Sequence, residues 1–169
     1  MHTNSSISEF RTGARYQALD GQKPSYNALY DISDFNLFSQ SKYTALRANR
    51  SPREAALVKR LEILDRRTCK TLLDTGRESF AAKDTAPVIS TLYVQPGPGQ
   101  DQMALKYLQE NYLAVLRKLP GWKRTGVHEV VDALVTGSSH APRSNVAAKY
   151  LIVNGKLSET PMPYLRTEC

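Results

Sequence analysis

The stretch PVISTLYVQPGPGQDQMALKYLQENYLAVLRKLPGWKRTGVHEVVDALV, residues 87–135, decides the fold. Val88–Val94 is a run of β-branched and apolar residues between a proline and a Pro-Gly-Pro-Gly segment, which predicts a strand bounded by turns. Residues 101–119 carry apolar side chains at helical spacing around more than one face, so we expect a long, substantially buried helix. A Pro-Gly pair ends it, and Trp122–Val135 then predicts a long strand.

The flanking sequence adds further strands and helices. On the C-terminal side, residues 146–153 predict one more strand. On the N-terminal side we expect a hairpin of strands 13–19 and 26–32 around the turn Asp20-Gly21. Two helices should follow, one over 34–49 capped by Asp34 and one over 52–64 capped by Ser51. A strand over 68–73 completes this half.

This order of elements defines a fold class. It reads β-β-α-α-β and then β-α-β-β, which predicts an α+β fold with an antiparallel sheet and helices on one face. The second half has the β-α-β-β beginning of a ferredoxin-like unit. We expect a disordered N-terminus over 1–12, one domain over 13–155 and a tail over 156–169.

Composition and charge limit the classes of binding partner and the cellular location that we expect. At 169 residues the chain has room for one domain, and its formal net charge of +7 raises the question of nucleic acid. The basic residues are scattered and interrupted by acidic ones, so a solvated basic face is favoured and nucleic acid ranks last. No apolar run reaches the length of a membrane span, and the first residues lack the pattern of a signal peptide. With two cysteines in the chain, a cytoplasmic location is expected.

Several segments resemble the EthD-like proteins of fungi. They are Arg15-Tyr16 through Asp20-Gly21, Pro24–Asp31, Tyr43–Arg47, Arg50–Glu54 and Lys118-Leu-Pro-Gly-Trp122. The resemblance implies a dimeric α+β barrel of two tandem ferredoxin-like units, 13–75 and 87–155, around an apolar cavity. It also implies a cofactor-independent activity, because members of this family act in several cases without metal or nucleotide.

Two departures from the family pattern bear on the chemistry. Under this resemblance the first segments of the chain match the second strand of the first unit, and the family's opening strand and helix are expected to be missing. The family helix carries a Glu-His pair, and the matching positions here are Glu110 and Asn111. Asparagine cannot exchange a proton near neutral pH, so imidazole chemistry from that position is not expected.

Two pairs of residues are the candidate catalytic groups. His128 and Asp132 are separated by an even number of residues on one predicted strand, which would place both side chains on one face. Tyr107 and Asn111 are four apart on the predicted helix and could hold a developing oxyanion. The alternatives are an exposed or merely packed His128 and a Tyr107 that fills the core.

Four further tyrosines are candidate substrate-binding residues: Tyr30, Tyr93, Tyr112 and Tyr150. Three of these lie on predicted strands, where aromatic residues are favoured in any case, so packing is the competing interpretation. Metal-ligand spacing, a phosphate-binding loop and a hydrolase nucleophile turn are all missing from the sequence. We therefore expect neither a metal nor a cofactor.

These observations lead to one expected function and one alternative. The expected function is a lyase, isomerase or cyclase of secondary metabolism that positions a small, apolar, polyketide- or terpenoid-like substrate in an apolar cavity. The alternative is a non-catalytic small-molecule binder or a degenerate EthD-like protein. An exposed apolar sheet face would need a partner, so a homodimer is expected.

Overall fold

The computed structural model describes residues 8–21, 23–76, 86–137 and 148–156. Its elements are β1 (Phe10–Gln17), β2 (Tyr26–Ile32), the 3-10 segment η2 (Phe35–Ser39), α1 (Ser41–Ala48), α2 (Pro52–Lys59), β3 (Leu64–Asp74), β4 (Val88–Val94), α3 (Asp101–Tyr107), the π-helical turn η3 (Leu108–Tyr112), α4 (Leu113–Leu116), β5 (Trp122–Thr136) and β6 (Tyr150–Lys156). Residues 1–7, most of the predicted tail and the start of the last predicted strand lie outside the described residues.

The strands form two antiparallel sheets. β1 and β2 pair as a hairpin, and the other four strands form a sheet in the order β3-β5-β6-β4. The predicted α+β class is confirmed, and the run from β4 to β6 is compatible with a ferredoxin-like arrangement. The hairpin does not join β3, because β3 pairs along its length with β5 from the second half of the chain.

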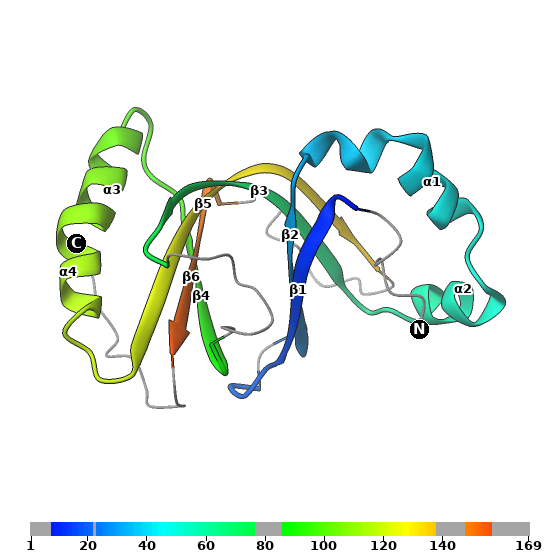
Figure 1. The fold of residues 1–169 in the computed structure, drawn as a ribbon, viewed down its shortest axis with the longest axis horizontal. Coiled ribbons are helices and arrows are strands. Elements are labelled where there is room, and N and C mark those ends of the chain that lie inside the picture. The colour runs from blue at the N-terminus through cyan, green and yellow to red at the C-terminus, as the bar shows by residue number, and fades with distance from the viewer. Residues whose placement is uncertain (1–7, 22, 77–85, 138–147, 157–169) are drawn as a thin grey trace.

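The main core lies between the helix α3–α4 and one face of the four-stranded sheet (Figure 1). It is built from Leu108, Tyr112, Leu113, Leu116, Val127 and Ile152. The buried polar groups beside it satisfy one another. Asn154 Nδ2 donates to the Tyr112 hydroxyl at 2.9 Å, and the Thr125 hydroxyl donates to Asn154 Oδ1 at 2.7 Å. A polar network satisfied in this way fixes the helix on the sheet.

The hairpin covers the opposite face of the sheet (Figure 1). Leu29 of β2 packs against a second apolar cluster around Leu151 and Val153 of β6. The Tyr16 hydroxyl of β1 donates to the Ala86 carbonyl at 3.1 Å. Helix, sheet and hairpin therefore form three layers, and the hairpin layer is the one that lies over the site described below.

The predicted elements are confirmed, with shifted boundaries. β1 begins at Phe10, so residues 10–12 are ordered strand rather than part of a disordered end. The predicted helix 34–49 is split at Gln40, whose backbone is extended, although Asp34 does cap its first turn by accepting from the Asn36 amide.

The predicted helix 52–64 is shorter than its sequence pattern. Ser51 caps it by accepting from the Glu54 amide at 3.2 Å, as expected. It ends at Lys59, because the following residues from Leu64 onward are recruited into β3 by pairing with the far end of β5. Among the described residues, no helix is long and apolar enough to cross a membrane.

Candidate functional site

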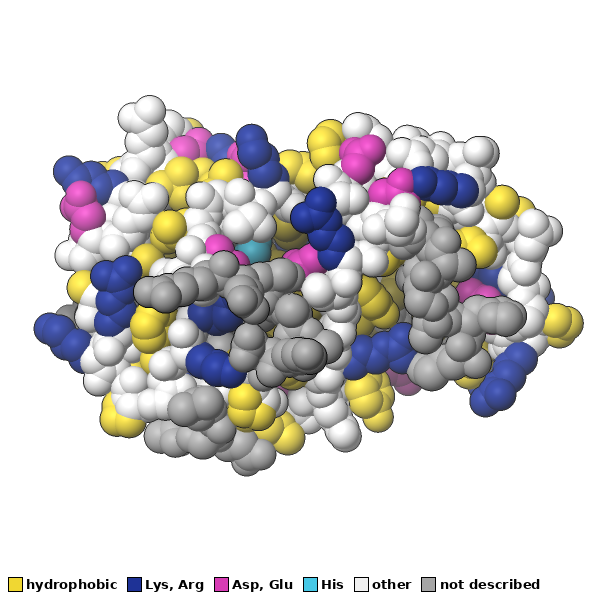
Figure 2. Space-filling view, in the orientation of Figure 1, with side chains coloured by type: hydrophobic (Ala, Val, Ile, Leu, Met, Phe, Trp, Pro, Cys, Tyr) yellow, Lys and Arg dark blue, Asp and Glu magenta, His cyan; other side chains and the backbone are white. Residues whose placement is uncertain are grey.

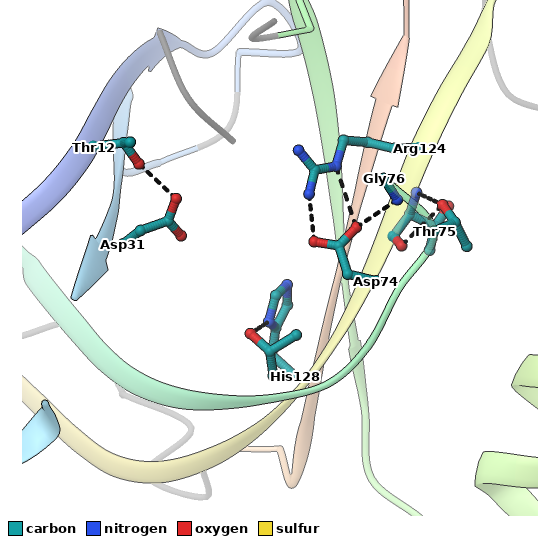
Figure 3. Close-up of polar contacts among 9 residues, drawn as sticks. Thr12, Asp31, Asp74, Thr75, Gly76, Arg124 and His128 are labelled. Atoms are coloured by element: carbon teal, nitrogen blue, oxygen red, sulfur yellow. Dashed lines mark hydrogen bonds and ion pairs between the residues drawn. The ribbon is translucent and has the colours of Figure 1, made fainter. Parts of the chain in front are cut away.

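A cluster of polar side chains lies on the sheet face that the hairpin covers (Figure 3). His128 and Arg124 come from β5, and Thr71 and Asp74 come from β3. Thr12 and Asp31 of the hairpin face them from the other layer (Figure 3). The cluster therefore sits between two layers, with the apolar residues Leu29, Val130 and Leu151 beside it.

Strand alternation places the β5 residues on one face. Arg124, Gly126 and His128 are two residues apart, and their cross-strand partners on β6 are Gly155, Val153 and Leu151. Gly126 leaves room for the imidazole, because a Cβ atom there would lie 2.5 Å from His128 Nε2. The ring therefore lies over Gly126 and its Nε2 is directed along β5 toward Arg124 and Asp74 (Figure 3).

Arg124 and Asp74 form an ion pair that is largely withdrawn from water. The Arg124 side chain is 6% exposed, and its Nε donates to Asp74 Oδ1 at 3.3 Å, while its Nη2 makes a second contact with Oδ2. The Gly76 amide also donates to Asp74 Oδ1, at 2.8 Å. A buried guanidinium needs such a fixed carboxylate, so this pair holds β3 and β5 in register next to His128.

His128 has the features of a neutral proton acceptor. Its Nδ1 lies 3.1 Å from the Thr71 hydroxyl, which fixes the ring, and its Nε2 has no hydrogen-bond partner among the described residues. Burial lowers the pKa of His128 below its ordinary value of 6.5; Asp74 and Asp31 oppose this lowering and Arg124 adds to it. The imidazole is therefore mainly uncharged at neutral pH, with one nitrogen open to a ligand.

The hairpin closes the cluster from the other side. The Thr12 hydroxyl donates to Asp31 Oδ2 at 2.5 Å. Burial raises the pKa of Tyr16, and the charge of Arg124 opposes the rise, which places this tyrosine near the same cluster. His128 is only partly buried, and Figure 2 shows histidine surface between acidic side chains on this side of the molecule. The imidazole can thus be reached from solvent.

Asp132 does not share a face with His128, so this part of the prediction is wrong. Thr68 pairs with Asp132 and Cys69 pairs with Val130, which leaves Val131 as a β-bulge without a partner. The bulge reverses the alternation, so Asp132 points to the opposite face of the sheet. There its carboxylate pairs with Arg66 at 3.1 Å, and its side chain is 57% exposed.

Tyr107 and Asn111 lie at the surface of the helix, on the other side of the sheet from His128. Tyr107 is 51% exposed, so the interpretation that it fills the core is wrong. The π-helical turn over Leu108–Tyr112 lies between the two residues and changes the four-residue spacing on which the prediction relied. The structure does not bring them together with His128.

The four candidate tyrosines are placed in four different environments. Tyr112 is in the main core, and Tyr150 is buried with its hydroxyl 3.4 Å from Asp101 Oδ1 at the start of α3. Tyr93 lies under the Arg67 guanidinium, 4.2 Å from ring centroid to carbon, and Tyr30 is 42% exposed on the hairpin. Packing accounts for Tyr150, as the competing interpretation for the strand tyrosines held, and it accounts for Tyr112 as well.

Sequence reasoning missed Thr71, Asp74 and Arg124. The available signal was the spacing of Arg124, Gly126 and His128, which puts a glycine between two functional side chains on one strand face. The described residues contain no group of three or more His, Cys, Asp or Glu side chains that could hold a metal ion.

Comparison with known proteins yields no relative from which a role could be transferred. No family model, no curated protein and no solved structure matches the chain. The site must therefore be interpreted from its own chemistry.

Proposed function

We propose that this protein is a cofactor-independent enzyme of small-molecule metabolism, of the lyase, isomerase or cyclase type. The observation that carries the proposal is His128, a partly buried imidazole with a lowered pKa and an Nε2 without a partner among the described residues. The resemblance of the sequence to EthD-like proteins supports the same class of activity.

The chemistry is proton transfer at a carbon next to a carbonyl group. His128 Nε2 takes the proton, and the electron pair of the broken C–H bond moves onto the carbonyl oxygen to give an enolate. The imidazolium formed in this step is stabilised by the nearby carboxylates Asp74 and Asp31, which act on the His128 charge. It then returns the proton to another atom of the substrate, or to a leaving group. Proton and electrons balance within the substrate and His128.

The side chains around His128 favour a hydrophobic substrate that carries a few oxygen atoms. The apolar side chains of Leu29, Val130 and Leu151 lie beside the polar cluster. Arg124 supplies positive charge near the position where the enolate oxygen would develop, although Asp74 neutralises part of it. A polyketide-like molecule has both acidic C–H groups and large apolar surface, and it is the substrate class that we propose.

Deuterium exchange tests this proposal without knowledge of the natural substrate. The full chain is incubated in D2O with a panel of aryl ketones and 1,3-dicarbonyl compounds, and NMR follows loss of the α-proton signal. The native protein should accelerate exchange in at least one compound, and His128→Gln should reduce that rate at least 100-fold. Asp132→Asn is the matched control, because that residue lies on the other face of the same strand.

The result distinguishes catalysis from binding. Equal exchange rates for the native protein and His128→Gln would contradict a role for His128 as a base. Ligand-induced shifts of the His128 NMR signals without any exchange would instead favour the alternative function, a non-catalytic binder.

A further inference from the structure

Strand β4 is an open edge of the four-stranded sheet. All seven residues from Val88 to Val94 pair with β6 on one side. Within the described residues, no other strand pairs with β4, which stands last in the strand order. None of its residues has a further hydrogen bond beyond those of this pairing, apart from the contact of the Ser90 hydroxyl with Asn154. Its outer backbone donors and acceptors are therefore available to another strand.

The two edges of this sheet differ in how they are protected. The opposite edge, β3, carries Asp65, Arg66, Arg67, Lys70 and Asp74 and is bulged at Leu72. Charges and bulges of this kind prevent edge-to-edge pairing. β4 has the sequence VISTLYV, with no charged residue, no proline and no register shift.

β4 also exposes apolar side chains in its second half. Leu92 is 44% exposed, and Thr91 is exposed as well. Tyr93 is 47% exposed, although the Arg67 guanidinium lies over its ring. An edge strand that is regular, uncharged and apolar is a site for strand addition, because main-chain hydrogen bonds then add to apolar burial.

We propose that a second copy of this chain occupies this edge, with β4 pairing antiparallel to β4 about a two-fold axis at Thr91. The strand is self-complementary in this register. Val88 of one copy lies opposite Val94 of the other, Ile89 opposite Tyr93, Ser90 opposite Leu92, and Thr91 opposite Thr91. Aromatic residues opposite β-branched residues, and threonine opposite threonine, are stabilising cross-strand pairs.

In this pairing, the same side of the sheet faces the same way in both copies. Ile89, Thr91 and Tyr93 share the hairpin side of the sheet, and each is matched with a residue on the same side. The result is a continuous eight-stranded sheet with both α3–α4 helices on one side, since each copy contributes four strands. The isologous contact makes a closed dimer, and it does not depend on the function proposed for His128.

Charge at the two-fold axis tests the proposal. Sedimentation or light scattering of the native chain at about 100 µM should give twice the mass of one chain. Thr91→Lys and Thr91→Glu should each be monomeric at that concentration, because two like charges would face each other across the axis. An equimolar mixture of the two variants should recover the dimer. Leu72→Lys on the other edge is the matched control and should stay dimeric.

A covalent test does not depend on how well the charged variants fold. Directly opposed residues of antiparallel strands have Cα atoms about 4.5–5.5 Å apart, which suits a disulfide. Thr91→Cys, in a Cys169→Ser background, should therefore form a covalent dimer on mild oxidation, while Leu72→Cys should not. A monomeric native chain, a dimer that survives Thr91→Lys, or no crosslink through position 91 would each overturn the proposal.

Discussion

At the scale of single residues, His128 couples stability to pH. Burial lowers its pKa in the folded protein below 6.5, the value expected when the chain is unfolded. Between these two pKa values the unfolded chain binds more protons, so stability is fully present above pH 6.5 and decreases as the pH falls through the lowered pKa. We expect urea unfolding to give a lower free energy at pH 5.5 than at pH 7.5.

The variant His128→Gln separates this effect from other titrations. It should remove part of the loss in unfolding free energy between pH 7.5 and pH 5.5, because glutamine has no proton to gain. The same pKa should appear in catalysis, with the exchange rate rising through it and reaching a plateau by neutral pH. A variant with an unchanged pH dependence of stability would show that His128 is not shielded from water as described.

At the scale of elements, the Arg124–Asp74 pair fastens β3 to β5. Asp74→Asn would leave a guanidinium that is 6% exposed without its carboxylate. We expect a loss of about 3 kcal/mol in unfolding free energy, because removing the carboxylate from a buried ion pair is costly. Asp132→Asn should lower the unfolding free energy by only about 0–1 kcal/mol. It also breaks an ion pair between β3 and β5, but the Asp132 side chain is 57% exposed. Chemical denaturation of both variants measures the difference.

The helices and strands also show which features could be predicted from the sequence and which could not. Ser51-Pro52 and Asp34 were correct cap predictions, because a cap depends on the residues next to it. The single-residue bulge at Val131 was not predictable, since it arises from pairing with β3, about 60 residues away in the chain. That bulge is why Asp132 failed as a partner for His128, and the carboxylate whose charge acts on the His128 pKa is Asp74 of β3 instead.

At the scale of the whole molecule, the layer arrangement was the least predictable feature. The pattern of residues 10–32 identifies a hairpin, yet nothing in that pattern says which sheet face the hairpin will cover. The outcome depends on contacts between distant residues, such as Leu29 with Leu151 and Tyr16 with Ala86. The candidate site exists only because these layers meet, so reasoning along the chain could find His128 but not its surroundings.

The same arrangement predicts that the hairpin opens independently of the sheet. A two-stranded hairpin is marginally stable by itself, and this one is anchored on the sheet by few apolar side chains, chiefly Leu29. Amide hydrogen exchange should therefore be faster in residues 10–32 than in β5 and β6, which pair on both sides or carry the main core. Leu29→Ala should increase exchange in the hairpin alone, whereas Val127→Ala, in the main core, should increase it throughout the sheet. Exchange of the hairpin amides at the rate of the sheet in the native protein would instead mean that the hairpin and the sheet open together as one unit.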